Sequence, residues 1–350
     1  ERSLVPVVQD RAPLRDNQRL VSRMTPPAPA ESADRPGLGL DDPMAEAARK
    51  ILRRQFELML RHEPGTRVGE DIEELHDMRV ATRRMRAALR VFGDYVDRKP
   101  VIKGLRATGR ALGAVRDLDV FWEQTQDYID TLPPTQQDGL TPLRQAWEQK
   151  HRKARAELLR YLDSDEYARF KTRFERFVAP REGIIGPRLN RKGEAVPYRA
   201  RHVAPLVIHR RFVAVQAYDE WVTQPHAPPA WLHRLRIAAK RLRYALEFFE
   251  EILPPEAPEL IDELKKLQDH LGALQDAAVA TDLLRDFLAR GTWGDKGVEP
   301  GQSIVAPGVE AYLSAREEEM ECRREAFPDI WRTFQSPAFK ERIARVVAPL

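Results

Sequence analysis

A basic segment of eighteen residues occurs twice in this chain. Residues 75–92 read LHDMRVATRRMRAALRVF, and residues 232–249 read LHRLRIAAKRLRYALEFF. At an offset of 157, nine of the eighteen aligned positions are identical, and several others exchange similar residues. A repeat of such a long period predicts two similar halves rather than a solenoid of short units.

The cations of each copy recur every three or four residues, so on a helix they fall on one stripe. The first basic row consists of His76, Arg79, Arg83, Arg86 and Arg90. The second basic row consists of His233, Arg236, Lys240 and Arg243. Glu247 then stands where the first copy has Arg90. Apolar residues border the first row on both sides, which is typical of a helix that packs beside its charged stripe.

Such a row needs a compensating anion. Like charges at this spacing destabilise a helix by about 0.2–0.5 kcal/mol per pair, and few acidic residues lie within the same reach. The rows could form a solvated face or pair with acids of a neighbouring helix. Because the row is written twice, we interpret it instead as the binding surface for an extended polyanion.

The composition makes this basicity local. The chain has 58 basic and 54 acidic residues, a net charge of +4, which favours a defined site over general coating of nucleic acid. Its length of 350 residues allows two domains, and 42% hydrophobic residues suffice for a core. The single Cys322 excludes an internal disulfide framework and suits a reducing compartment, so we expect a cytoplasmic protein. No apolar run approaches the roughly 20 residues of a membrane span.

The sequence divides into four segments. Residues 1–43 are rich in proline and predict a tail or linker, residues 44–178 a first helical half, residues 179–197 a linker, and residues 198–350 a second half. In the first half we expect helices at 44–62, 70–96, 99–131, 140–163 and 165–178. In the second half we expect helices at 198–223, 230–253, 256–290, 308–326 and 335–347. No segment alternates convincingly enough to predict a strand, so each half should be an antiparallel bundle of about four long helices.

The repeat extends beyond the basic rows. LGAVRDLDV at 112–120 matches LGALQDAAV at 271–279. The glycines of these segments, Gly113 and Gly272, suggest a close helix crossing or a local packing need, and Asp117 and Asp276 are placed to orient arginines of the basic helices. Helical spacing and weaker alignment add four further candidate cations: Arg53, Arg210, Arg106 and Lys265.

The two basic segments, each followed by LGxxxD, resemble the CHAD family, the conserved histidine α-helical domain. The resemblance covers roughly residues 43–347. It implies an all-α fold of two four-helix bundles related by a pseudo-two-fold, with a central basic groove or pore that binds long-chain inorganic polyphosphate. Carried over by position, both basic rows would face the ligand, and Glu247 departs from that pattern. The resemblance implies no cofactor and no catalysis.

The resemblance also bears on neighbouring domains. CHAD domains often follow a CYTH domain, the fold that binds or hydrolyses triphosphates, so an upstream CYTH domain is an expectation for a longer chain. No acidic ExExK signature of that domain occurs here. Some family members are similar to proteins of polyhydroxyalkanoate granules, so association with such granules or with polyphosphate granules stays open.

Three other interpretations compete with polyphosphate binding. ELHDMR faintly resembles a phosphoacceptor histidine segment around His76, but no nucleotide-binding motif accompanies it. A metal site is disfavoured because His76 has arginines rather than carboxylates or histidines one turn away, and no HxxxH or HxxE pair occurs. A scaffold for nucleic acid or for partner proteins remains the main alternative, since nucleic acid presents a similar phosphate backbone. The basic rows lack aromatic stacking platforms, which makes nucleic acid the weaker ligand.

Overall fold

The computed structural model describes residues 35–180, 188–190, 192–224, 228–291, 293 and 304–348. The chain divides into two units, Glu1–Arg35 and Pro36–Leu350, and all described helices belong to the second unit. Most of the predicted tail at 1–43 and part of the predicted linker at 179–197 lie outside the described residues. The described part is almost entirely α-helical, which confirms the predicted all-α class.

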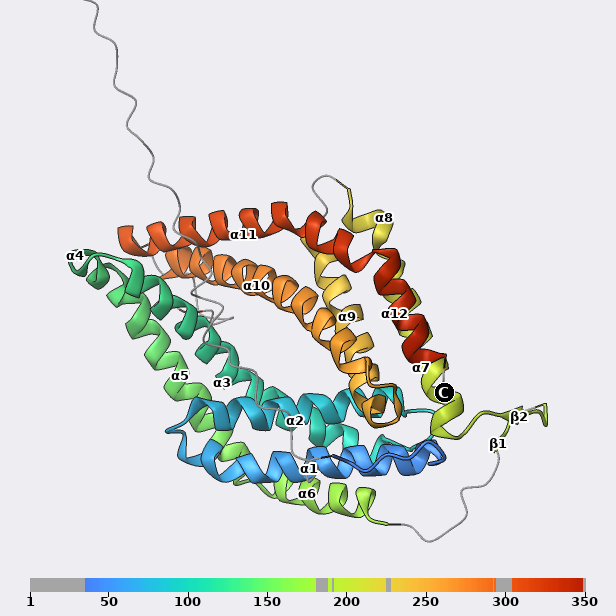
Figure 1. Ribbon diagram of the computed structural model, residues 1–350. Coiled ribbons are helices and arrows are strands. Elements are labelled where there is room, and N and C mark those ends of the chain that lie inside the picture. Colours follow the sequence, from blue (N-terminus) through green and yellow to red (C-terminus); the bar gives the residue numbers. More distant parts are fainter. Residues whose placement is uncertain are drawn as a thin grey trace, which may run out of the picture. The chain divides into compact units, whose positions relative to one another are not determined.

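The first half contains four helices of 20 or more residues and two shorter ones (Figure 1). Its elements are α1 (Met44–Val68), α2 (Ile72–Val91), α3 (Lys99–Thr131), α4 (Pro134–Gln137), η4 (Asp138–Leu140), α5 (Thr141–Leu162) and α6 (Asp165–Val178). Helix α1 packs on α2 and α6, and α3 packs on α2, α5 and α6. Asp71 and Ser164 accept backbone hydrogen bonds at the starts of α2 and α6, so both helices begin at capping residues.

The second half repeats this arrangement among its described residues, again with four longer helices and two shorter ones. Its elements are α7 (Ala200–Gln216), α8 (Asp219–Val222), α9 (Pro229–Phe249), η5 (Glu250–Ile252), α10 (Ala257–Arg290), α11 (Pro307–Phe334) and α12 (Pro337–Val347). Helix α9 packs on α7 and α10, as α2 packs on α1 and α3 in the first half. The LGxxxD segments thus lie on the long helices next to the basic ones.

Two helices are longer than predicted. In each of them the prediction ended the helix shortly before a proline, but the helix continues through that proline. Helix α1 was expected to end at 62 but continues through Pro64 to Val68, and α11 was expected to end at 326 but continues through Pro328 to Phe334. A proline removes one helical hydrogen bond, and side-chain contacts compensate for it. Glu63 accepts a hydrogen bond from Tyr167 at 2.9 Å. The buried Trp331 donates to Asp219 at 2.7 Å.

A small antiparallel sheet corrects the expectation that no strand occurs. Strands β1 (Arg188–Leu189) and β2 (Ala195–Val196) pair in the register Arg188 with Val196. Both strands lie in the predicted linker between the halves. With two residues each, they are too short to show an alternating pattern, so the sequence offered no strand signal.

The two halves meet where equivalent residues of the repeat face each other. Phe92 and Phe249, which occupy the same position in the two copies, contact with ring centroids 5.7 Å apart. The backbone N–H of Met44 at the start of α1 donates to Tyr198, and the N–H of Ala200 at the start of α7 donates to Asp42. These reciprocal contacts are those expected of a local two-fold axis that relates the halves.

A second junction joins the halves at the far ends of the long helices. Tyr128 of α3 stacks on Tyr312 of α11 with centroids 4.6 Å apart, and Thr125 donates a hydrogen bond to Tyr312. Phe121 packs edge-on against Trp293 at 4.6 Å. One hydrophobic core runs through both halves. The basic helices α2 and α9 therefore lie between two points at which the halves are held together.

Candidate anion-binding site

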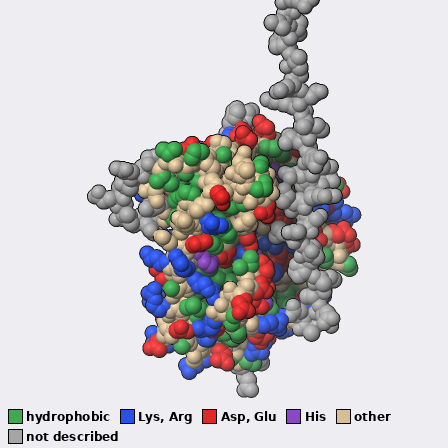
Figure 2. Space-filling view, turned by 90° about the vertical axis from the view of Figure 1, so that its left-hand side faces the viewer, with side chains coloured by type: hydrophobic (Ala, Val, Ile, Leu, Met, Phe, Trp, Pro, Cys, Tyr) green, Lys and Arg blue, Asp and Glu red, His purple; other side chains and the backbone are tan. Residues whose placement is uncertain are grey.

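Helices α2 and α9 contact each other, which brings the two basic rows together. Arg83 and Lys240 occupy equivalent positions in the repeat and lie within electrostatic range of each other. Asp117 and Asp276, another pair of equivalent residues, also lie within electrostatic range of each other. The local two-fold axis therefore passes between the rows. Elsewhere, Figure 2 shows basic and acidic side chains interspersed over one face, in keeping with the small net charge.

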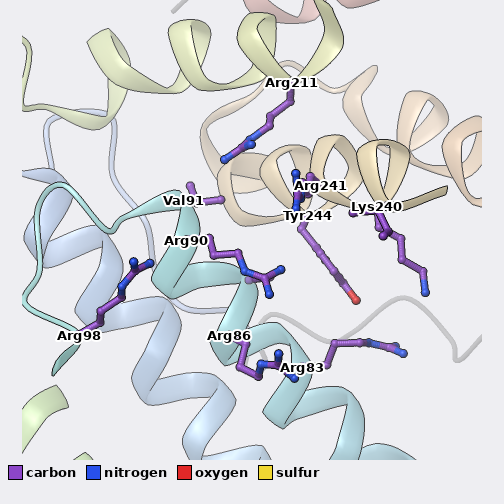
Figure 3. Close-up of a pocket in the computed structure, with 11 residues that line it drawn as sticks. Arg83, Arg86, Arg90, Val91, Arg98, Arg211, Lys240, Arg241 and Tyr244 are labelled. Carbon is purple, nitrogen blue, oxygen red and sulfur yellow. The ribbon is translucent and has the colours of Figure 1, made fainter. Parts of the chain in front are cut away.

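A cavity of about 510 Å³ opens between α2, α7 and α9 (Figure 3). Its lining residues are Arg83, Arg86, Ala87, Arg90, Val91, Arg98, Arg211, Ile237, Lys240, Arg241 and Tyr244. Seven of these are cations and none is acidic. Among the described residues, none of the seven forms an ion pair with a carboxylate. The cavity is thus a concentration of positive charge that the described part of the protein does not neutralise.

Burial and crowding lower the pKa of three of these cations. Burial, together with repulsion from Arg236 and Arg83, lowers the pKa of Lys240 to about 7. Burial, followed by repulsion from nearby arginines, also lowers the pKa of Arg90 and that of Arg211. An arginine remains charged at neutral pH after a modest shift, whereas an amine with a pKa near 7 is charged only in part. An anion in the cavity would relieve this repulsion.

The two repeated glycines provide space for arginine side chains. A Cβ atom added to Gly113 would lie 3.6 Å from Nε of Arg79, and one added to Gly272 would lie 3.5 Å from Nη2 of Arg236. The nearest contacts at both glycines are guanidinium groups. Of the two expectations, local packing therefore describes these glycines better than a close helix crossing.

The two repeated aspartates stand next to the same arginines. Asp117 forms an ion pair with Arg79, with Nη2 and Oδ1 2.9 Å apart. Asp276 lies within electrostatic range of Arg236 and Lys240. Burial raises the pKa of both carboxyls. Asp117 thus orients Arg79 by direct contact, and Asp276 acts on its half only through longer-range attraction among the described residues.

Neither predicted histidine lines the cavity. His76 is half-buried, and burial together with the nearby Arg116 lowers the pKa of its imidazole, so it is mainly neutral at pH 7. His233 is exposed, and its Nδ1 lies 2.6 Å from Oε1 of Gln275. Among the described residues, no group of three or more His, Cys, Asp or Glu side chains is arranged to hold a metal ion.

Only some of the predicted cations line the cavity. Arg83, Arg86, Arg90 and Lys240 share the cavity, and Arg106 lies outside its lining but within electrostatic range of Arg90. Five more predicted cations do not line the cavity: Arg79, Arg236, Arg53, Arg210 and Lys265. Lys265 is exposed and pairs with Asp262 at 2.8 Å.

Glu247 closes the end of the second basic row. Its side chain is only 6% exposed and forms ion pairs with both Arg243 and Arg84, each at 2.5 Å. Nε of Arg243 also donates to Oε1 of Gln268 at 3.0 Å. Arg243, a predicted ligand residue, is therefore occupied by protein partners.

Sequence reasoning missed four lining residues: Arg98, Arg211, Arg241 and Tyr244. Arg241 is identical to Arg84 of the first copy, but it lies off the stripe that we followed. Arg211 follows the predicted Arg210 and aligns with Arg54. Arg98 and Tyr244 have no equivalent in the other copy, so no repeat signal marked them.

Two comparisons with known proteins name the same family. The model of the CHAD domain matches residues 50–285. The crystal structure of the CHAD domain from the plant Ricinus communis is similar with a TM-score of 0.65 and 26% sequence identity, and the match covers 84% of this chain and 93% of that chain. PptA from Streptomyces chartreusis has a similar fold, with a TM-score of 0.59 and 17% identity over 83% of this chain and 100% of that chain. Among curated proteins no match is found.

The family match covers both basic helices and both LGxxxD segments. It confirms the family that the repeated motifs predicted. None of the helices in the described residues is long and apolar enough to cross a membrane. This chain belongs to the CHAD domain family.

Proposed function

We propose that this protein binds long-chain inorganic polyphosphate through its two basic rows, without catalysis. The observation that carries the proposal is the cavity between α2 and α9, into which both rows project cations and no carboxylate. Polyphosphate carries about one negative charge per phosphate and no bases. Arginine suits such a ligand because its planar fork donates two hydrogen bonds to phosphate oxygens.

The lining favours a phosphate chain over nucleic acid. Proteins that hold single-stranded nucleic acid generally stack its bases on aromatic side chains. Tyr244 is the only aromatic residue in the lining of this cavity, beside seven cations. From this cavity the chain would extend along the two basic rows, as in the central basic groove or pore that the family resemblance implies.

Calorimetric titration tests the proposal. The purified protein is titrated at physiological salt with long-chain polyphosphate and, separately, with single-stranded DNA. We expect tight binding of polyphosphate and clearly weaker binding of DNA. No binding of polyphosphate, or equal affinity for both polymers, would reject the proposal.

A charge-reversal variant locates the binding surface. Arg83→Glu with Arg86→Glu removes two cavity cations, and we expect an affinity loss of at least about 100-fold, because each contact to a charged group contributes about 1.5–3 kcal/mol. The matched control is Arg152→Glu with Lys153→Glu, which changes the net charge equally at exposed positions of α5. Circular dichroism checks that both variants stay helical. Equal affinities of the two variants would show that binding depends on overall charge alone.

A further inference from the structure

The two sides of the local two-fold axis differ in charge. On one side Arg84 of α2 forms an ion pair with Glu247 of α9. The repeat makes Arg241 the equivalent of Arg84, and Arg90 the equivalent of Glu247. On the other side, therefore, two arginines stand where the first side has an arginine and a carboxylate. Arg90 and Arg241 lie within electrostatic range of each other and repel.

Cations from outside the basic rows strengthen this difference. Arg98 precedes α3 and Arg211 lies on α7, and both line the cavity next to Arg90 and Arg241 (Figure 3). Arg211 lies within electrostatic range of Arg241. Four arginines thus converge on this side of the axis. On the opposite side, Glu247 forms ion pairs with both Arg84 and Arg243 and offsets one of their two positive charges.

Two buried polar atoms of residues that line the cavity have no hydrogen-bond partner among the described residues. The hydroxyl of Tyr244 and Nε of Arg83 form no hydrogen bond with any described residue. Tyr244 is 6% exposed, and Figure 3 shows it extending from α9 toward Arg83 on α2. A buried polar atom without a partner is costly. Both atoms belong to residues of the cavity lining, where a phosphate oxygen would supply the missing acceptor.

We propose that this cavity is a distinct oligophosphate site, which binds a short run of phosphates with higher affinity than the rest of the basic surface. The run is either a segment of the polyphosphate chain or free tripolyphosphate. The inference rests on the proposed function and adds that binding is one-sided: the chain is anchored at Arg90, Arg98, Arg211 and Arg241 and not at the Glu247 side. The volume of about 510 Å³ lies within the range of small-molecule sites.

Titration with two ligands tests this site separately from the basic rows. The ligands are tripolyphosphate and long-chain polyphosphate, and the main variant is Arg98→Ala with Arg211→Ala, which leaves both rows unchanged. We expect tripolyphosphate affinity to fall at least about tenfold, since two charge-assisted contacts are lost. Long-chain affinity should fall by a clearly smaller factor than tripolyphosphate affinity, because both rows still hold the rest of the chain. The charge-matched control, Arg152→Ala with Lys153→Ala, should leave both affinities unchanged.

A second variant tests the hydroxyl without altering charge. Tyr244→Phe keeps the ring and removes only the buried hydroxyl, so the fold is preserved. We expect tripolyphosphate to bind about threefold to tenfold more weakly, as for the loss of one hydrogen bond. Unchanged tripolyphosphate affinity in both variants would overturn the inference.

The remaining outcomes separate the inference from the function on which it rests. A wild-type protein that binds long-chain polyphosphate but no tripolyphosphate overturns the distinct site and leaves the proposed function standing. Equal losses for both ligands in the Arg98 and Arg211 variant mean one continuous site, which also overturns the inference. Absence of binding to either ligand overturns the proposed function itself.

Discussion

The two halves of this protein carry nearly the same basic helix and use it differently. In α2 the row continues through Arg86 to Arg90, and its last residues line an open cavity. In α9 the row ends at Arg243, which pairs with Glu247, and Glu247 pairs with Arg84 as well. One acidic residue in the second copy thus turns one end of a symmetric cation array into a structural contact and leaves the other end uncompensated.

This comparison teaches that repeated residues need not have repeated roles. A duplicated row suggests two equivalent binding surfaces. Here the two-fold axis brings the copies together, so residues of one copy contact residues of the other. Residues near the axis contact their own counterparts, as Phe92 and Phe249 do. A change in one copy therefore alters the surroundings of both.

Removal of Glu247 should have the largest effect, because it eliminates the acidic residue by which the two halves differ. Glu247→Ala leaves Arg84 and Arg243 without their carboxylate at a position that is 6% exposed. We expect the free energy of unfolding to fall by about 3 kcal/mol, as for other buried ion pairs that lose one partner. Urea denaturation measures the change. A loss below about 1 kcal/mol would place the pair among weak surface contacts and remove the structural role of Glu247.

The equivalent change in the first copy should weaken polyphosphate binding and leave the stability of the fold unchanged or slightly higher. Arg90→Ala removes a cation that has no ion pair among the described residues and that repels Arg86 and Arg241. We expect unchanged or slightly higher stability, with about tenfold weaker polyphosphate binding, since a contact to a charged group contributes about 1.5–3 kcal/mol. The slope of log affinity against log salt should also become shallower by about one unit. Parallel urea and calorimetric measurements decide, and destabilisation like that of Glu247→Ala would contradict the asymmetry.

The equivalent residues Arg83 and Lys240 should differ in their response to pH. The pKa of Lys240 is lowered to about 7 in the free protein, so the amine is protonated below pH 7 and loses its charge above it. A bound phosphate favours the charged form. Affinity should therefore be highest below pH 7 and fall by up to about 30-fold by pH 8.5, where the lysine must take up a proton to bind.

Calorimetry in buffers of different ionisation heat detects the proton uptake. Lys240→Arg is the matched variant, because arginine keeps its charge over the whole range. The pH dependence that remains in this variant belongs to the ligand. A variant that loses affinity with pH as steeply as the wild type would exclude Lys240 as the titrating group.

The smallest effect is expected at the paired glycines. In Gly113→Ala and Gly272→Ala the new Cβ atoms would lie about 3.5–3.6 Å from arginine nitrogens, which is ordinary van der Waals contact. Each change should raise stability by up to about 1 kcal/mol through helix propensity and leave binding nearly unchanged. Thermal unfolding measures this. Gly113→Leu and Gly272→Leu should instead displace Arg79 and Arg236, and equal stability of the Ala and Leu variants would refute the packing role.

Much of the architecture was predictable from local pattern. The spacing of apolar residues indicated the long helices, and α3 was predicted at its observed bounds of 99–131. Predicted ends failed at Pro64 and Pro328, where buried partners distant in sequence hold the helix beyond a proline. Helix ends depend on such tertiary contacts, and a local pattern does not contain them.

The sequence by itself determined an all-α chain of two similar halves, because helical periodicity and the repeat are local properties that each segment carries alone. It also determined that cations would line one face of α2 and of α9. Only the tertiary structure decided which cations are free: Arg83, Arg86, Arg90 and Lys240 share a cavity, whereas Arg243 pairs with Glu247. It also brought Arg98, Arg211 and Arg241 to the same place. The physical reason is that neutralisation depends on which helices meet across the two-fold axis, and that meeting joins residues far apart in the chain.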